Sequence, residues 1–356
     1  MYIYIGALFI SIIFAFLALS AKAVEGNSRK EKFVSIWIYR GFAIISFLPL
    51  FILSALRYGI GTDYFYRYVP GFLSVESGQS GGYEIGFYLI NKIIAICTSN
   101  YQWLFVLTSL IFCGFMYLAI YEQSDYVIYS IILFVITTTY FISLNTVRQC
   151  VAVAIFIYAI KYAVDKKTKK YFIFIIIAAL IHMSAFIYIP LYFILNRKFK
   201  TQIISIIAIL VFMPFVYDIM RFILSFTKYQ GYFHTAFNTG IFDYWSFIVN
   251  LCVLLFGYIF YKKLHNERKY IIFLNLQFIT VVLLIFSAII PLISRAILCF
   301  TFAQIIFIPY LIKNIENKYL RISVKIAILI LYTFYMIHTI VLKGYQQVLP
   351  YQSIFS

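Results

Sequence analysis

The chain has 356 residues, of which 64% are hydrophobic and only 12% are charged. Soluble globular domains carry about 25% charged residues, and a soluble core could not enclose the apolar runs of about twenty residues that recur along this chain. The net charge of +17 does not indicate nucleic-acid binding, because the lysines and arginines lie in short clusters between apolar runs and not in a binding motif.

The apolar runs predict an all-α, polytopic integral membrane protein with about ten membrane-spanning helices in a single membrane domain, residues 1–356. Every backbone polar group in lipid needs a partner within its own segment, and a helix supplies one. The runs are too long and too uniformly apolar for the alternating strands of an outer-membrane barrel. The expected spans are 2–21, 36–56, 101–121, 126–145, 147–164, 203–224, 244–261, 270–290, 296–312 and 322–342.

Basic clusters between these spans predict the orientation of the chain. Cytoplasmic loops carry an excess of lysine and arginine, so all four clusters are expected in the cytoplasm and the first residues outside. The clusters lie at 29–32, 166–170, 262–269 and 313–321.

The apolar segment 171–195 does not fit this scheme as a single crossing, because basic residues both precede and follow it. A single crossing would place the cluster at 262–269 outside, against the charge rule. We therefore expect a re-entrant hairpin of two half-helices, broken near His182, Met183 and Ser184. One long tilted span that locally violates the charge rule is the alternative.

The extracytoplasmic segments follow from this topology. The longest is the loop 57–100, which is rich in glycine and tyrosine, and within it residues 84–97 are expected to form an amphipathic helix on the membrane surface. A second loop is expected at 225–243. Long ordered loops usually carry function.

Ionisable residues within or beside spans are costly and therefore indicate function. Apart from the basic clusters few are present, and on this topology nearly all of them lie at or near the outer face. They are Arg57, Asp63, Arg67, Glu84, Arg148, His182, Asp243 and Arg295.

The residue types suggest distinct roles, each with a structural alternative. Arg57 could grip phosphate oxygens with two hydrogen bonds, or it could anchor a helix end at the interface. The polar run Asn145 to Gln149, which includes Arg148, is either part of a site or a solvated turn. Glu84 could accept a sugar hydroxyl, act as a general base or form a structural ion pair. His182 could shuttle protons or be a hydrogen-bonded packing group.

The sequence lacks the motifs that several other kinds of site require. The four histidines are not at metal-ligand spacing, no Walker motif is present, and the outer loops contain no Asp-x-Asp pair. The five cysteines are single and form no Cys-x-x-Cys pair, so a disulfide framework is not expected. We expect no cofactor and a metal-independent reaction, in which arginines replace the cation.

Five motifs, taken in order, resemble the signature of EpsG-type, Wzy-like bacterial polysaccharide polymerases, which make O-antigen, capsule or exopolysaccharide. The likeness covers nearly the whole chain. The motifs are residues 56–64 (LRYGIGTDY), 83–87 (YEIGF) with Asn91, 145–149 (NTVRQ), 181–185 (IHMSA) and 348–355 (VLPYQSIF).

This resemblance implies a glycosyltransferase of the bacterial cytoplasmic membrane whose site faces the periplasm or the cell exterior. Such an enzyme transfers a growing glycan from undecaprenyl pyrophosphate to the non-reducing end of a new lipid-linked repeat, and the lipid pyrophosphate leaves. The bilayer and the two lipid-linked oligosaccharides are its partners, and a chain-length regulator and a flippase are further candidates.

Under this hypothesis the catalytic residues are His182, Glu84, Arg148 and Arg57. Arg57, Arg148 and Arg295 bind the donor pyrophosphate, and His182 or Glu84 removes the proton of the acceptor hydroxyl. The remaining substrate-binding residues position the sugars or the arginines, and they are Asp63, Tyr64, Asn145 and Gln149.

Three other functions compete with this one. A ligase would move a finished glycan from the same lipid to another acceptor. A flippase or transporter of lipid-linked sugars would need a pathway open alternately to both faces, and such folds often show inverted repeats, which this chain lacks. A structural or sensor membrane protein would not explain the arginines, histidine and glutamate at one face.

Overall fold

Apolar runs become helices along the whole described part of the computed structural model, which comprises residues 1–23, 29–197, 216–225, 241–288, 295 and 297–356. The elements are α1 (Tyr2–Ala23), α2 (Arg29–Ala55), η1 (Tyr64–Tyr68), α3 (Val69–Glu76), α4 (Ile85–Cys97), α5 (Gln102–Gln123), α6 (Val127–Ile136), α7 (Thr139–Ser143), α8 (Val147–Val164), α9 (Thr168–Ile181), η2 (Met183–Ile187), α10 (Tyr188–Leu195), α12 (Val216–Ser225), α13 (Tyr244–Ile259), α14 (Tyr261–Leu264), α15 (Arg268–Ile285), α17 (Leu298–Phe302), α18 (Gln304–Lys313), α19 (Lys318–Met336), η5 (Ile337–Leu342) and η6 (Tyr345–Gln347).

The predicted class, an all-α polytopic membrane protein, is confirmed. Within the described residues six helices are long and apolar enough to cross a membrane, namely α1, α2, α5, α8, α15 and the continuous run of α19 and η5. Shorter apolar helices of 10–17 residues accompany them. Most of the predicted span 203–224 and of the predicted loop 225–243 lies outside the described residues.

The segment predicted as one span at 126–145 is two helices. α6 ends at Ile136, and Thr138 takes a left-handed backbone conformation with a φ of 66° before α7 begins. The hydroxyl of Thr137 donates to the carbonyl of Leu133 and contacts the hydroxyl of Thr139 at 2.9 Å. Threonine side chains that bond to nearby backbone groups compete with helical hydrogen bonds, so the threonine run interrupts the span.

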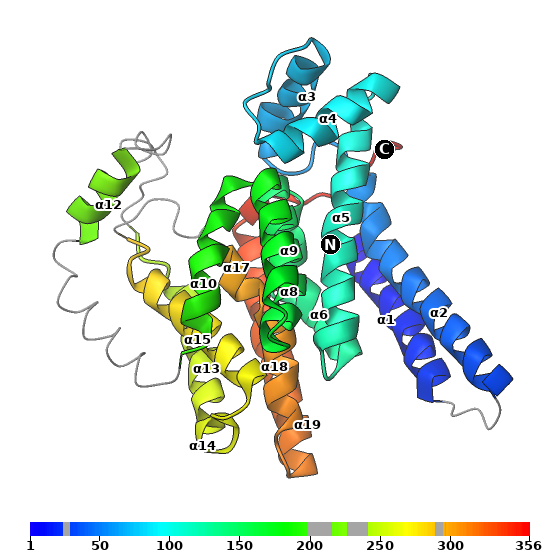
Figure 1. Ribbon diagram of the computed structural model, residues 1–356. Helices are drawn as coiled ribbons and strands as arrows, with labels where there is room; N and C mark the ends of the chain where they lie inside the picture. The colour runs from blue at the N-terminus through cyan, green and yellow to red at the C-terminus, as the bar shows by residue number, and fades with distance from the viewer. Residues whose placement is uncertain (24–28, 198–215, 226–240, 289–294, 296) are drawn as a thin grey trace.

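The predicted hairpin at 171–195 is confirmed, with its break at His182. α9 ends where His182 takes an extended conformation, and η2 and α10 then return (Figure 1). The hydroxyl of Tyr171 donates to the carbonyl of Tyr188 at 2.7 Å, and the hydroxyls of Thr168 and Tyr192 lie 2.6 Å apart. The start of α9 therefore lies beside the end of α10, which excludes the alternative of one long tilted span.

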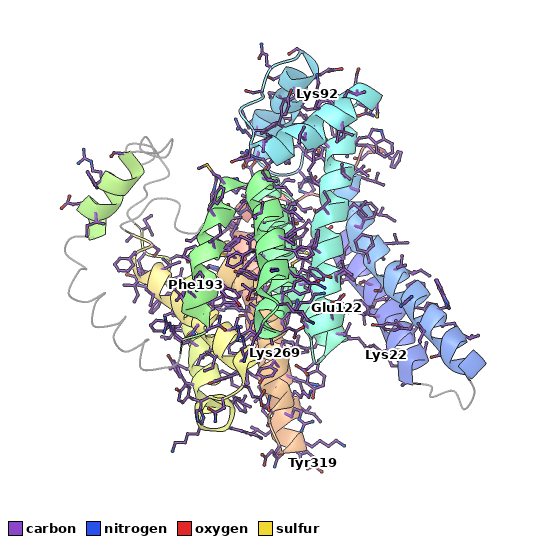
Figure 2. The ribbon with its side chains drawn as sticks, in the orientation of Figure 1. Lys22, Lys92, Glu122, Phe193, Lys269 and Tyr319 are labelled. Atoms are coloured by element: carbon purple, nitrogen blue, oxygen red, sulfur yellow. The ribbon has the colours of Figure 1, made fainter. Side chains whose placement is uncertain are left out.

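The bundle has two chemically different ends. We call one the basic end, because it carries the lysines that follow α8, α14 and α18, and Lys269 and Lys313 there both bind Asp125, at 3.1 and 2.7 Å. Figure 2 shows Lys22, Lys269 and Tyr319 at this end and Lys92 at the other. The predicted clusters of basic charge thus share one end of the molecule.

Residues 57–100 cover the opposite end, which we call the capped end. η1, α3 and α4 lie across the ends of α5, α8 and α9 (Figure 1). α4 matches the helix predicted at 84–97. The cap approaches the bundle closely at Gly61, where an added Cβ would lie 2.9 Å from the carbonyl oxygen of Leu144.

The C-terminal segment, residues 343–356, binds the chain that leaves α2. The backbone amide of Tyr58 donates to the carbonyl of Gln352 at 3.0 Å, and that of Ile354 donates to the carbonyl of Leu56 at 3.0 Å. The hydroxyl of Tyr4 donates to the carbonyl of Val348 at 3.1 Å. Three distant parts of the sequence are thereby joined at the capped end.

Replacing Gly61 by alanine tests how tightly the cap is seated. Gly61 has a φ of +89°, which alanine rarely adopts, and its Cβ would meet the backbone after α7. We expect Gly61→Ala to destabilise the protein by about 1–2 kcal/mol, measured as a lower unfolding temperature in detergent. Gly114→Ala in α5, whose Cβ would meet nothing within 4 Å, is the matched control and should not lower that temperature.

Candidate functional site

One carboxylate at the capped end binds two cationic or titratable side chains. Arg148 Nη1 lies 2.6 Å from Glu84 Oε2, and His182 Nδ1 lies 3.3 Å from Glu84 Oε1. The three side chains are only 12–14% exposed. They come from the start of α4, the start of α8 and the break after α9, and we call them the carboxylate cluster. The structure thus brings together residues that the sequence offered in three separate motifs.

A glycine allows this meeting. Gly86, in the first turn of α4, contacts the end of α9 so closely that an added Cβ would lie 2.7 Å from the carbonyl oxygen of Leu180. Glu84 precedes α4 as its N-cap residue and His182 ends α9. Because α4 can rest directly on the last turn of α9, the two side chains come within bonding distance.

The environment of the cluster favours its charges. Burial opposes ionisation of the Glu84 carboxyl, but the hydrogen bond with His182 and the charge of Arg148 outweigh it, so the pKa of Glu84 lies well below its ordinary value. The guanidinium of Arg148 lies 5.1 Å from the ring centre of Tyr83 and 5.7 Å from that of Phe87. Aromatic faces attract cations, so the rings help to hold Arg148 in place.

A second carboxylate, Asp63, lies near three arginines. Burial raises the pKa of Asp63 above its ordinary value, against the opposing charges of Arg295, Arg148 and Arg67. Its position is set by Asn145, whose Oδ1 accepts a hydrogen bond from the Asp63 backbone amide at 2.8 Å. Asp63 thus lies at the boundary between the carboxylate cluster and Arg295.

Asn145 links the cap to the C-terminal segment. Its Oδ1 also accepts a hydrogen bond from the Thr62 hydroxyl at 3.1 Å, and its Nδ2 donates to Oε1 of Gln346. Gln149, one turn further along α8, donates from Nε2 to the backbone carbonyl of Arg295 at 2.5 Å. Both amides were predicted to position other groups, and in the structure they hold Asp63, Gln346 and Arg295.

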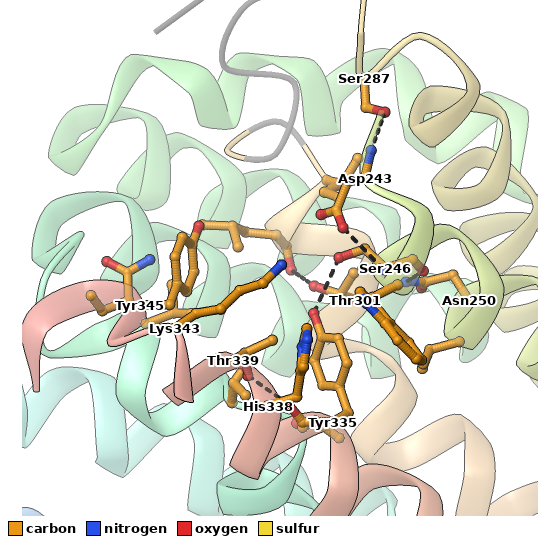
Figure 3. A pocket seen from close by; sticks show the side chains of 18 of the residues that line it. Asp243, Ser246, Asn250, Ser287, Thr301, Tyr335, His338, Thr339, Lys343 and Tyr345 are labelled. Carbon is orange, nitrogen blue, oxygen red and sulfur yellow. Dashed lines mark hydrogen bonds between the residues drawn. The ribbon is translucent and has the colours of Figure 1, made fainter. Parts of the chain in front are cut away.

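A cavity of about 990 Å³ opens beside these residues. Thr62, Asn145 and Arg295 form part of its wall, and α13, η5 and the C-terminal segment form much of the rest (Figure 3). Asp243, Ser246, Tyr335, His338 and Lys343 also line it. Apart from Asp243, sequence reasoning missed these residues, because each is an isolated polar group in or after an apolar run.

Arg57 and Tyr64, which we expected to contact substrate, are packing residues in this structure. Both are 1% exposed. Arg57 donates to the backbone carbonyl of Ser54 and, at 3.2 Å, to the Ser109 hydroxyl, and its guanidinium lies 4.7 Å from the ring centre of Phe105. Neither residue lines the cavity.

Tyr64 shares this packing. Its ring stacks on that of Phe105 at 4.1 Å, and its hydroxyl donates to Oε1 of Gln102 at 2.9 Å. The structure shows no exposed face of Arg57 or Tyr64 for substrate, and their expected substrate contacts stay predictions. The two residues anchor the cap to α5.

The ionisation of Glu84 gives a pH-dependent stability that can be measured. Glu84→Gln should destabilise the protein by about 1–3 kcal/mol at pH 7, because it removes two charge-assisted hydrogen bonds. The folded-state pKa is depressed, so the stabilisation is fully present above the unfolded pKa of about 4.3 and is lost as the pH falls through the folded pKa.

Unfolding midpoints from pH 8 to pH 3 would test this. The difference between wild type and Glu84→Gln should stay constant down to about pH 5 and shrink below it. Glu76→Gln, at the end of α3, serves as the control and should follow the wild type. A difference that grew as the pH fell would contradict an ionised Glu84.

Comparison with known proteins identifies the family. The model of the EpsG family matches residues 41–353, which include the cap, the carboxylate cluster and most of the C-terminal segment. No curated protein and no solved structure matches the chain. The chain belongs to the EpsG family, and this membership implies a role in polymerising polysaccharide.

Proposed function

We propose that the protein joins oligosaccharide repeats carried on undecaprenyl pyrophosphate, at the outer face of a bacterial cytoplasmic membrane. The observation that carries this proposal is the carboxylate cluster, in which Glu84 binds both Arg148 and His182 beside a polar cavity. The cluster lies opposite the basic end, and basic loops mark the cytoplasmic side. The capped end then faces the periplasm or the cell exterior.

Within this function His182 is the general base. An ionised Glu84 accepts a hydrogen bond from Nδ1–H of His182, which fixes the ring and leaves Nε2 able to take a proton. Of our two candidates for the base, Glu84 is the poorer, because its depressed pKa makes it a weak proton acceptor. Glu84 is a positioning residue for His182 and Arg148.

The reaction replaces one bond to the anomeric carbon by another and transfers one proton. The acceptor hydroxyl loses its proton to His182, and its oxygen bonds to the anomeric carbon of the donor glycan. The bond between that carbon and the lipid pyrophosphate breaks, and the pyrophosphate leaves with the electron pair. Arg148 and Arg295 stabilise the developing negative charge, a role that needs no metal ion.

Arginines outnumber carboxylates around Asp63. Arg67, Arg148 and Arg295 lie near Asp63, and Glu84 is the other carboxylate of the group. The balance is one positive charge, which suits an anionic leaving group. Asp63, whose pKa burial raises, is placed to bind a sugar hydroxyl between the cluster and the cavity.

A reconstituted assay with lipid-linked repeats from the producing strain tests the reaction. Wild type should form a ladder on a sizing gel without added metal and in the presence of a chelator. His182→Gln should lower the rate about 10²- to 10⁴-fold and Arg148→Lys about 10²- to 10³-fold. The controls His265→Gln and Arg40→Lys lie outside the cluster and should keep the ladder.

Other products would identify the competing functions. A single transfer without a ladder would indicate a ligase. Lipid-linked sugar that crosses a vesicle membrane without any transfer would indicate a flippase. Loss of the ladder on chelation would contradict the metal-independent mechanism.

Cysteine labelling tests the orientation separately. Cys97 is exposed at the end of α4, so in a Cys252→Ala background a membrane-impermeant maleimide should label it in intact spheroplasts. Lys167→Cys, placed at the basic end in a Cys97→Ala, Cys252→Ala background, should react only after permeabilisation. The reverse pattern would place the cluster in the cytoplasm and refute the proposal.

A further inference from the structure

We propose that the cavity beside the carboxylate cluster is a saccharide-binding chamber that holds the acceptor repeat, with Asp243 and Tyr335 as the residues that recognise its hydroxyl groups. The saccharide class rests on the chemistry of the cavity wall. The assignment to the acceptor rests on the proposed function.

Asn250, Gln304 and Tyr332 line the cavity and belong to a buried network of polar side chains that also includes Gln277. Gln304 Nε2 donates to Asn250 Oδ1 at 2.6 Å and to Gln277 Oε1 at 2.9 Å, and the Tyr332 hydroxyl donates to Gln304 Oε1 at 2.6 Å. All four residues are buried, on α13, α15, α18 and α19. Satisfied polar networks are rigid, so this network supplies a fixed polar surface inside an apolar bundle.

Asp243 and Tyr335 also present polar groups to the cavity. Asp243 caps α13, where its Oδ1 accepts a hydrogen bond from the Ser246 backbone amide at 3.2 Å. The hydroxyls of Ser246 and Tyr335 lie 3.1 Å apart. Figure 3 shows these side chains together with Lys343, directed into the cavity from α13, α19 and the C-terminal segment. Carboxylates accept, and phenols both accept and donate, as sugar hydroxyls require.

Aromatic rings border the same space. Trp245 and His338 both line the cavity, with their ring centres 5.1 Å apart, and Tyr345 lies on the wall formed by the C-terminal segment. Aromatic side chains with polar edges combine an apolar face with hydrogen bonding. The apolar C–H face of a pyranose ring packs on such a surface.

The mixed charges of the cavity wall favour a hydroxyl-rich ligand over a metal cation or a small anion. Arg295 and Lys343 line it and disfavour a metal cation, while Asp243 disfavours a small anion bound beside it. A lipid tail could form no hydrogen bonds with this polar wall. A neutral, hydroxyl-rich molecule can use the carboxylate, the amides and the aromatic rings at once.

The connection to the cluster indicates which substrate the cavity takes. Asn145 lines the cavity and also binds the backbone amide of Asp63. Arg295 lines the cavity too, and its carbonyl binds Gln149, which follows Arg148 in the sequence. An oligosaccharide in the cavity would therefore reach Asn145 and Arg295, the two lining residues that bind Asp63 and Gln149. The volume of about 990 Å³ is at the upper end of the range of about 300–1,000 Å³ for small-molecule sites. This suits an acceptor of one repeat, because the donor glycan grows without limit.

Binding of the lipid-free repeat oligosaccharide, released by mild acid from its carrier, tests the chamber without any catalysis. Titration calorimetry on the full chain in nanodiscs should show binding by wild type. Asp243→Asn keeps a helix-capping side chain but loses the charge, and we expect its Kd to rise about 10- to 100-fold. Tyr335→Phe should weaken binding as well, whereas Asp165→Asn at the basic end should not.

Further outcomes distinguish oligosaccharide binding in the chamber from the transfer reaction. His182→Gln should slow formation of the ladder far more than it raises the Kd for the oligosaccharide, and Asp243→Asn should raise KM for the acceptor more than it lowers kcat. No binding by wild type, or equal binding by well-folded Asp243→Asn and Tyr335→Phe, would overturn the chamber even if the ladder forms. Binding as expected without any ladder would refute the polymerase and leave a saccharide site of another function.

Discussion

The capped end depends on the charge of Glu84. A carboxylate that is only 12% exposed at the end of an apolar bundle needs partners, and it finds them in Arg148 and His182, which lie 64 and 98 residues further along the chain. This one group therefore fixes the relative positions of α4, α8 and the break after α9. These contacts hold the cap over the bundle. The cavity opens nearby, beside Arg295. An uncharged residue at position 84 would leave the arginine and the histidine without the acceptor that orients them.

Sequence reasoning predicted much of this arrangement, because membrane physics leaves few choices. Length and apolarity set the helices, and the count of basic clusters required an even number of crossings at 171–195, which the hairpin satisfies. The motifs around Glu84, Arg148 and His182 identified the cluster residues, although not their contacts. Arg57 shows where prediction from the sequence stops. An arginine at a helix end looks the same in sequence whether it faces water or, as here, the serines of α2 and α5.

The cavity could not be predicted for a different reason. Asn250, Gln277 and Gln304 are amides in three different apolar helices, and nothing in the sequence shows that they face one another. Their meeting depends on the rotation of each helix about its own axis, which packing determines and hydropathy does not. The break at Thr138 is similar, because a short threonine run is compatible with a continuous helix until the surrounding contacts favour the alternative.

The backbone pairing between the chain after α2 and residues 347–354 has a consequence for biogenesis. The carbonyl of Leu56 and the amides of Tyr58 and Gly61 pair with residues that are synthesised much later than they are. α1 and α2 pack against each other as a helical hairpin (Figure 1). After they insert into the membrane, the backbone groups that follow α2 therefore stay without these partners until residues 347–354 are made. The connection after α2 is therefore fixed only once residues 347–354 have been made, and a nascent chain that stalls before residue 343 would carry the carboxylate cluster without the C-terminal part of the cavity wall.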